Sequence, residues 1–176
     1  MTLINFFSII FHGIPRKLGF IMNVCFIGHK KIETNEKLLF NLTETVITLL
    51  NKGVTTFFFG SKSQFNDLAW EVVSKLKKDY PFITRVYVRS AFQHINSSYE
   101  KYLLTFYEKT YFPQNIEKAG KYSYVERNFE MIDKSTYCVF YYNENYTSTL
   151  KRNSGTKTAF LYARKKKKEI INLYKQ

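Results

Sequence analysis

Short apolar runs that alternate with amphipathic segments are the feature that most limits how this chain can fold. The apolar runs lie at residues 24–27, 55–59, 83–88, 136–142 and 170–173. Between them, apolar residues recur at helical spacing within residues 35–52, 68–76, 124–132 and 155–163. Continuous apolar runs are typical of strands buried on both faces of a parallel sheet, and right-handed crossovers then place helices on both faces. The pattern predicts a three-layer α/β fold with a mainly parallel sheet of about five strands.

The two ends of this pattern define the predicted domain. We expect residues 22–176 to form a single domain, with a loop and a short helix at 91–122, where helical periodicity is lost although aromatic residues are frequent. Residues 1–21 precede the first strand and are interpreted as a non-core arm or a start-site extension. Their apolar run is shorter than the roughly 20 residues that cross a bilayer, and basic residues follow it instead of preceding it as in a secretory signal. Attachment at a membrane surface is the alternative for this segment.

The amino-acid composition limits the classes of binding partner that suit this chain but identifies no single partner. Of the 176 residues, 45% are hydrophobic and 18% aromatic, which is enough for a sizeable core. The net charge of +13 favours polyanionic partners such as nucleotides, nucleic acid or acidic membrane faces. Two cysteines without a Cys-x-x-Cys pair predict neither a zinc module nor a disulfide scaffold, so we expect a cytoplasmic protein and no metal. Cys25 and Cys138 fall within predicted central strands as small buried side chains, with a redox pair as the alternative.

The residues directly after each predicted strand are the candidates for a site, because ligands bind beyond the carboxyl ends of strands in open α/β sheets. Three such segments share one predicted edge: Gly28-His29-Lys30, the stretch from Gly60 through Ser61 and Lys62 to Asp67, and Ser154-Gly155-Thr156. Glycine permits close backbone approach, hydroxyl groups donate hydrogen bonds, and a helix N-terminus offers unpaired N–H groups, a combination that suits phosphate. Neither G-x-G-x-x-G nor G-x-x-x-x-G-K-[ST] occurs, so the common dinucleotide and triphosphate cradles are excluded.

Each of these segments also has a structural interpretation. Ser154-Gly155-Thr156 could simply begin a helix. His29 could be a turn or capping residue, and Lys30 and Lys62 could be ordinary surface lysines. Their shared position at strand exits is what favours the ligand-binding interpretation over these alternatives.

Five motifs in fixed order resemble one known family. They are Cys25-Phe-Ile-Gly-His-Lys30, Phe59-Gly-Ser-Lys-Ser-Gln-Phe65, Tyr124-Val-Glu-Arg-Asn-Phe-Glu-Met-Ile-Asp133, Ser154-Gly-Thr-Lys-Thr-Ala-Phe160 and Ile170-Ile-Asn-Leu173. Together they resemble the SLOG superfamily, specifically its YpsA/YspA-like bacterial branch, over residues 23–174. The resemblance implies a Rossmann-like fold and binding of a nucleotide or nucleotide-derived ligand by a sensor or effector. Relatives include the Lonely Guy phosphoribohydrolases and the DNA-processing protein A, which loads single-stranded DNA.

The same resemblance adds a helix to the predicted site. By motif position Arg127, Asn128 and Asp133 join the three loops as ligand-binding residues. A guanidinium matches phosphate oxygens, and a carboxamide can read a base or a ribose. The structural alternative is that Arg127 pairs on the helix surface with one of three carboxylates, those of Glu126, Glu130 and Asp133. Tyr141 and Tyr142, at the end of the fourth predicted strand, could stack on a base.

Two departures from the family pattern bear on activity. Many relatives carry Gly-Gly-x-x-Gly-Phe-Asp in the second loop, so here either Asn66 or Asp67 matches the aspartate. The phosphoribohydrolases use a carboxylate in Pro-Gly-Gly-x-Gly-Thr-x-x-Glu, yet no Asp or Glu lies between Gly155 and Glu169. The sequence therefore favours ligand binding, with N-glycosidic hydrolysis and single-stranded nucleic-acid binding as alternatives. The basic run 164–168 motivates the last of these, and the oligomeric state stays open.

Overall fold

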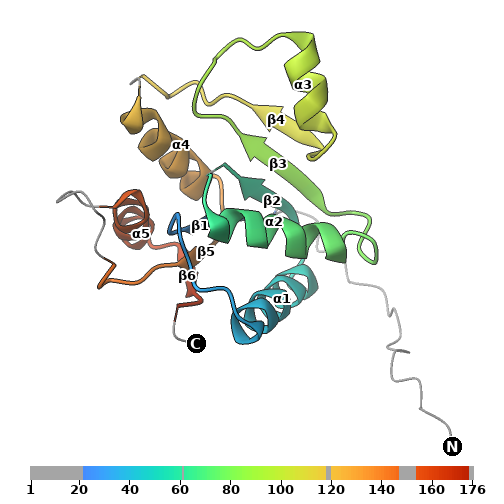
Figure 1. Cartoon of the computed structure of the whole chain (residues 1–176), viewed down its shortest axis with the longest axis vertical. Helices are drawn as coiled ribbons and strands as arrows, with labels where there is room; N and C mark the ends of the chain where they lie inside the picture. The colour runs from blue at the N-terminus through green and yellow to red at the C-terminus, as the bar shows by residue number, and fades with distance from the viewer. Residues whose placement is uncertain (1–21, 61, 118–119, 147–153, 175–176) are drawn as a thin grey trace, which may run out of the picture.

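The computed structural model describes residues 22–60, 62–117, 120–146 and 154–174, which form one six-stranded parallel sheet with helices packed on both faces (Figure 1). The elements in chain order are β1 (Met22–Gly28), α1 (Glu36–Asn51), β2 (Val54–Phe59), α2 (Gln64–Leu76), β3 (Thr84–Val88), α3 (Ser97–Leu104), β4 (Lys109–Tyr111), α4 (Lys121–Asp133), β5 (Tyr137–Tyr141), α5 (Gly155–Lys165) and β6 (Glu169–Asn172). The predicted α/β fold is confirmed. The expectations for residues 1–21 concern a segment outside the described residues.

The sheet has one strand more than the sequence predicts. The additional strand, β4, has three residues and pairs with β3 at the edge of the sheet, within the segment expected to hold a loop and a short helix. A strand of three residues is too short to show a periodic pattern, and at an edge its side chains need not be apolar. The short helix expected in the same segment is α3.

Alternate residues of the central strands supply two separate apolar cores. Val24 and Phe26 of β1 face one side, where they pack with buried residues of α1 and α2. Cys25 and Ile27 face the other side, where they pack with buried residues of α4 and α5. Because both faces are covered, β1 and β5 are apolar almost throughout, which is why the sequence shows continuous runs there instead of alternation.

The two cysteines lie directly opposite each other on β1 and β5, and both side chains are fully buried and free. A hydrogen bond with Cys25, together with burial, raises the pKa of the Cys138 thiol. A thiol that stays protonated is a poor nucleophile. This environment favours the structural interpretation of the pair.

The strand order β4-β3-β2-β1-β5-β6 sets where a ligand can bind. From β1 the chain proceeds outward through β2, β3 and β4, and it then returns to place β5 and β6 on the other side of β1. The switch point therefore lies between β1 and β5, where connections leave the carboxyl ends in opposite directions, and this is the place where open α/β sheets commonly bind ligands. None of the described helices has the length and apolarity that crossing a membrane requires.

Candidate functional site

His29 joins the exits of the two strands at the switch point. Its backbone N–H donates to the carbonyl of Tyr141, at 3.3 Å, and its side chain is 2% exposed. The backbone N–H of Asn143 donates to His29 Nε2 at 2.9 Å, and the imidazole stacks on the ring of Tyr146 with centroids 3.9 Å apart. The same Nε2 lies 3.3 Å from the carbonyl oxygen of Asn143, so the tautomer of the ring decides whether Nε2 accepts from the N–H or donates to this carbonyl. His29 is therefore a buried part of the strand exits, bound to the backbone of Asn143 and stacked on Tyr146.

The buried imidazole gives a pH prediction. Burial lowers the pKa of His29 below its ordinary value of 6.5, although a hydrogen bond with the backbone of Asn143 opposes this shift. The unfolded chain then takes up a proton at a pH where the folded chain does not, so the free energy of unfolding should fall as the pH drops below 6.5. The loss should level off below the folded-state pKa. Urea unfolding between pH 7.5 and pH 5 measures it.

The matched control for this prediction is His29→Gln, which keeps an acceptor for the Asn143 N–H but has no titrating ring. In this variant the free energy of unfolding should lose the fall that protonation of His29 causes at acid pH. All other ionisable groups contribute equally in the two proteins. The same pH dependence in both proteins would contradict a neutral, buried imidazole.

The first two loops are tied together beside His29. Gly28 has no room for a side chain, since a Cβ there would lie 2.4 Å from the ring of Phe65, in the first turn of α2. Lys30 is exposed, but its carbonyl accepts a hydrogen bond from the N–H of Gln64 at 3.0 Å. The side chain of Gln64 in turn accepts from the N–H of Ile32 at 2.9 Å. These bonds fix the exit of β1 against the start of α2.

In the second loop, the sequence leaves open whether Asn66 or Asp67 matches the aspartate of the family. Asn66 is the buried one of the two. Its Oδ1 accepts from the N–H of Gly60 at 3.2 Å, and its Nδ2 donates to the carbonyl of Phe26 at 3.0 Å. Asp67 is exposed, as is Lys62, while Ser61 lies outside the described residues. Asn66 thus holds the end of β2 against β1, and Asp67 is an exposed residue of the first turn of α2.

Arg127 of α4 reaches the same loop from the opposite face of the sheet. Its Nη1 donates to the carbonyl of Gly60, its Nε donates to Oδ1 of Asn128 at 3.1 Å, and its guanidinium lies 5.6 Å from the ring centroid of Tyr124. The Arg127 side chain is 1% exposed and that of Asn128 7%. A Cβ on Gly60 would lie 2.7 Å from Arg127 Cδ. The arginine is therefore packed into the sheet edge at the exit of β2.

The charge of Arg127 has no carboxylate partner. None of the ion pairs among the described residues involves it, and all 14 Asp and Glu residues of the chain lie in the described part. Glu130 pairs with Lys134, so the alternative of surface pairing along α4 is wrong. Burial lowers the pKa of Arg127 to about 10, which still leaves it charged at neutral pH. A buried cation without a counterion costs several kcal/mol, and an anionic ligand would offset that cost.

Asp133 does not join the site. It lies at the C-terminal end of α4, whereas the ligand edge is at the opposite end of this helix. Its carboxylate accepts from the hydroxyl of Tyr162 at 2.8 Å and pairs with Lys166 at 3.2 Å. Lys168 donates to the Asp133 carbonyl at 2.9 Å. Two lysines of the basic run 164–168 therefore bind this far end of the molecule.

The third predicted loop segment begins α5. The Ser154 hydroxyl caps the helix by accepting from the N–H of Lys157 at 3.1 Å, so the helix-start interpretation is confirmed. A Cβ on Gly155 would meet nothing within 4 Å, and Thr156 is 8% exposed. The helix begins at the carboxyl end of the sheet, because it follows β5 and precedes the parallel strand β6. The N–H groups at a helix start of this kind can bind an anion.

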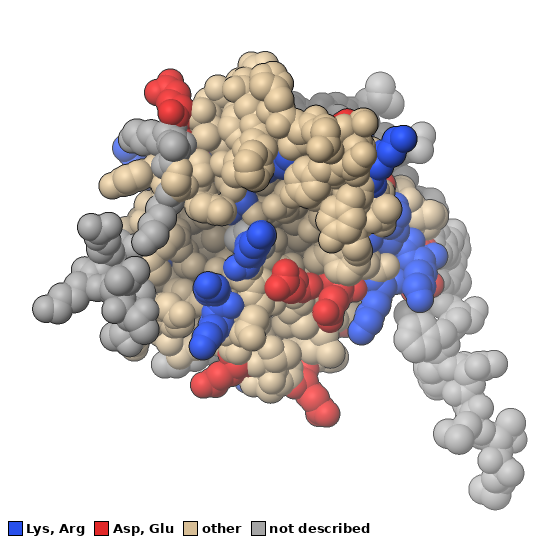
Figure 2. All heavy atoms as spheres, turned by 45° about the horizontal axis from the view of Figure 1, so that its top comes forward, with Lys and Arg blue, Asp and Glu red and all other residues tan. Residues whose placement is uncertain are grey.

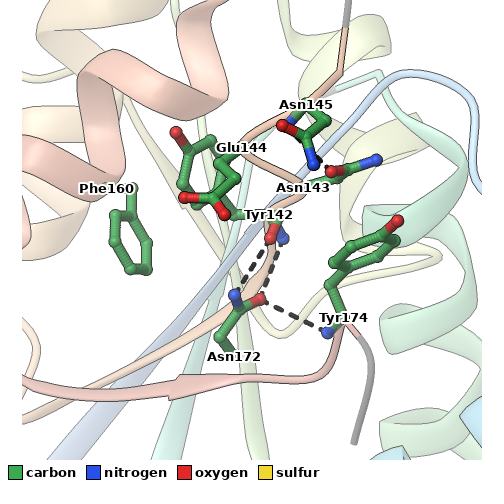
Figure 3. A pocket seen from close by; sticks show the side chains of 7 residues that line it. All are labelled: Tyr142, Asn143, Glu144, Asn145, Phe160, Asn172 and Tyr174. Carbon is green, nitrogen blue, oxygen red and sulfur yellow. Dashed lines mark hydrogen bonds between the residues drawn. The ribbon is translucent and has the colours of Figure 1, made fainter.

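A cleft of about 260 Å³ lies at the ends of β5 and β6, with Phe160 of α5 in its wall (Figure 3). Its walls combine aromatic and polar side chains, namely those of Tyr142, Asn143, Glu144, Asn145, Phe160, Asn172 and Tyr174. Tyr142 stacks on Phe160 with centroids 4.6 Å apart, and Asn172 exchanges two hydrogen bonds of 2.9 Å with the backbone of Tyr142. Of these residues the sequence singles out only Tyr142 as a possible ligand contact, although the strand-exit rule, applied to the last strand, points to Asn172.

The face in Figure 2 carries charges of both signs. Lys and Arg side chains gather at the right of this view, others stand apart nearer its centre, and Asp and Glu side chains lie between them, so no basic surface extends across the whole face. A continuous basic surface is the electrostatic signature of nucleic-acid binding. Within the described ranges, no group of three or more His, Cys, Asp or Glu side chains is arranged to hold a metal ion.

The comparisons with known proteins agree with the motifs. No curated protein matches the chain significantly. The family model described as the YspA SLOG family matches residues 23–175, which is nearly the whole described part. The resemblance found from the motifs is thereby confirmed. The chain therefore belongs to the YspA SLOG family, within a nucleotide-related superfamily.

Proposed function

We propose that the protein binds a nucleotide or a nucleotide-derived anion at the carboxyl edge of the sheet and acts as a ligand-responsive binding module. The observation that carries this proposal is Arg127, a buried arginine at the exit of β2 without a carboxylate partner among the described residues. An anionic ligand would supply the missing counterion. The membership in a nucleotide-related superfamily supports the same class of ligand.

The chemistry of the edge suits the separate parts of such a ligand. A planar base can stack on Tyr142 or Tyr174 in the cleft and exchange hydrogen bonds with the carboxamides around it. Phosphate oxygens match the guanidinium of Arg127 and the N–H groups at the start of α5. Asn143, bound to His29, lies in the cleft wall and so connects the cleft to the switch point.

The absence of a carboxylate from α5 favours ligand binding over hydrolysis. The phosphoribohydrolases that the sequence resembles place a catalytic carboxylate in this helix, whereas here α5 contains neither Asp nor Glu. Cleavage of an N-glycosidic bond needs an acid or base within reach of the leaving group. We therefore propose ligand binding as the function, because the helix from which the phosphoribohydrolases supply their carboxylate has none in this chain.

Thermal unfolding with a panel of ligands tests the proposal. Nucleoside monophosphates, nucleoside diphosphates, ADP-ribose and cyclic dinucleotides are compared with the phosphate-free nucleosides at millimolar concentration. A ligand at 100 times its Kd adds about 2.7 kcal/mol, which corresponds to a rise of roughly 5–10 °C in a domain of this size. At least one phosphorylated compound should give such a rise, and its nucleoside should give much less. Unchanged melting with the whole panel, or equal shifts with nucleosides, would refute the proposal.

A further inference from the structure

A second arginine stands at the same edge, one strand further along. Arg89 follows β3, and its N–H donates to the carbonyl of Tyr111 at 2.9 Å. Like Arg127, it takes part in none of the ion pairs among the described residues. Its Nε is shielded from solvent and has no hydrogen-bond acceptor. Buried donors are nearly always paired, so an unpaired one indicates a missing partner such as water or an anion.

The sheet brings the two arginines into one neighbourhood. Strands β2 and β3 are adjacent, with Phe59 level with Tyr87, so Gly60 and Arg89 leave neighbouring strand ends. Tyr87 lies within the electrostatic reach of both guanidinium groups: burial raises the pKa of its hydroxyl, and the charges of Arg127 and Arg89 both oppose that rise. The hydroxyl of Tyr87 is thus close enough to both guanidinium groups for their charges to act on it.

Arg89 also shapes the loop that follows it. Its Nη1 donates to the carbonyl of Phe92 at 2.6 Å and to that of Gln93 at 3.4 Å. Phe92 has φ = 59°, a left-handed conformation that is rare for a bulky residue, and its side chain is 75% exposed. Strained, exposed conformations of this kind are concentrated at functional sites. A cleft of about 400 Å³, lined by Phe92, His94, Ile95, Asn96 and Tyr99, opens beside the loop.

We propose that the binding site continues from Arg127 to Arg89 and takes a ligand with two linked phosphate groups, as in a nucleoside diphosphate. Arg127 holds the phosphate nearer the switch point, and Arg89 holds the terminal one. Neighbouring strands are about 4.8 Å apart, and three such intervals separate the end of β5, beside the Tyr142 cleft, from the end of β3, where Arg89 lies. The edge between the cleft and Arg89 is therefore about 14 Å long, which fits this class of ligand. This inference rests on the proposed function and adds the number of anionic groups.

Calorimetric titration with inorganic phosphate, inorganic pyrophosphate, AMP and ADP tests the inference on the full chain. Wild-type protein should bind pyrophosphate at least about ten-fold more tightly than phosphate, and ADP more tightly than AMP by a similar factor, because charge-assisted hydrogen bonds to the second phosphate are worth that much. Arg89→Gln should remove most of this preference and leave the affinities for phosphate and AMP nearly unchanged.

A second variant separates charge from loop structure. Arg89→Lys keeps the positive charge but loses the guanidinium whose Nη1 donates to the carbonyls of Phe92 and Gln93, so it should retain a clear preference for pyrophosphate. If Arg89→Lys loses the preference together with Arg89→Gln, then Arg89 only supports the loop and the inference is wrong. Arg164→Gln, at the far end of α5, serves as the charge control and should bind as wild type does.

This experiment distinguishes a missing second phosphate position from a protein that binds no nucleotide. Equal affinity of the wild type for phosphate and pyrophosphate, and for AMP and ADP, overturns the second phosphate position but leaves nucleotide binding intact. An equal loss of all four ligands in Arg89→Gln also overturns it. Absence of binding by all four ligands and by the thermal-unfolding panel overturns the proposed function itself.

Discussion

Replacing Arg127 with methionine should abolish the stabilisation by nucleotide while leaving the free protein folded. Methionine fills similar apolar space and removes the cost of a buried, uncompensated charge, which offsets the loss of the bond to the Gly60 carbonyl. We therefore expect the melting temperature of the free variant to stay within about 4 °C of the wild type. The ligand-dependent rise of roughly 5–10 °C should fall below about 1 °C, because the charge that attracts the phosphate is gone.

Arg164→Met is the matched control for this experiment. It also removes one arginine charge, but from an exposed position in the last turn of α5, remote from the ligand edge. Its response to nucleotide should equal that of the wild type. Undiminished nucleotide stabilisation of Arg127→Met would show that the buried guanidinium has no part in binding.

Gly28→Ala should have the largest effect on stability. The added Cβ would lie 2.4–2.5 Å from Cδ1, Cβ and Cγ of Phe65, a fully buried residue in the first turn of α2. Because the clash includes the Cβ of Phe65, rotation of the ring cannot relieve it, and the strand exit or the helix must move. Overpacking of this kind costs about 3 kcal/mol, which lowers the melting temperature by roughly 6–12 °C.

Gly155→Ala is the control for Gly28→Ala. It makes the same change at the first residue of α5, where a Cβ would meet nothing within 4 Å, and alanine favours a helix more than glycine does. Its melting temperature should equal or exceed that of the wild type. A Gly28→Ala protein as stable as Gly155→Ala would contradict the packing described at the exit of β1.

Gly28 and Gly60 show what the sequence can and cannot predict about the site. A glycine directly after a buried strand indicates that no Cβ fits there, and this holds for Gly28 and Gly60. The sequence attributes the crowding to an approaching ligand, whereas in the structure the space is filled by Phe65 and by Arg127. Local pattern reveals the constraint, but the side chain that imposes it comes from another element of the fold.

Contacts between distant elements also explain the other differences between the predicted and the observed site. Asn66 and Asp67 are equivalent by pattern, and the choice between them depends on which side chain faces the end of β1 after α2 has docked. The position of Arg127 was predicted from its motif, but its burial depends on the packing of α4 against the sheet edge. Arg89 carries no motif at all. Its place beside Arg127 follows from the pairing of β2 with β3, which sequence periodicity does not specify.

The most direct measurement of the central claim is an NMR titration of protein labelled with ¹⁵N-arginine, in which ADP is added and the side-chain Nε–H signals are followed. The signal of Arg127, assigned by its absence from Arg127→Met, should move to saturation at the same ADP concentration that raises the melting temperature, while the signal of the remote Arg164 stays in place. If ADP stabilises the protein and the Arg127 signal does not move, the anion binds elsewhere, and the account of this sheet edge is wrong.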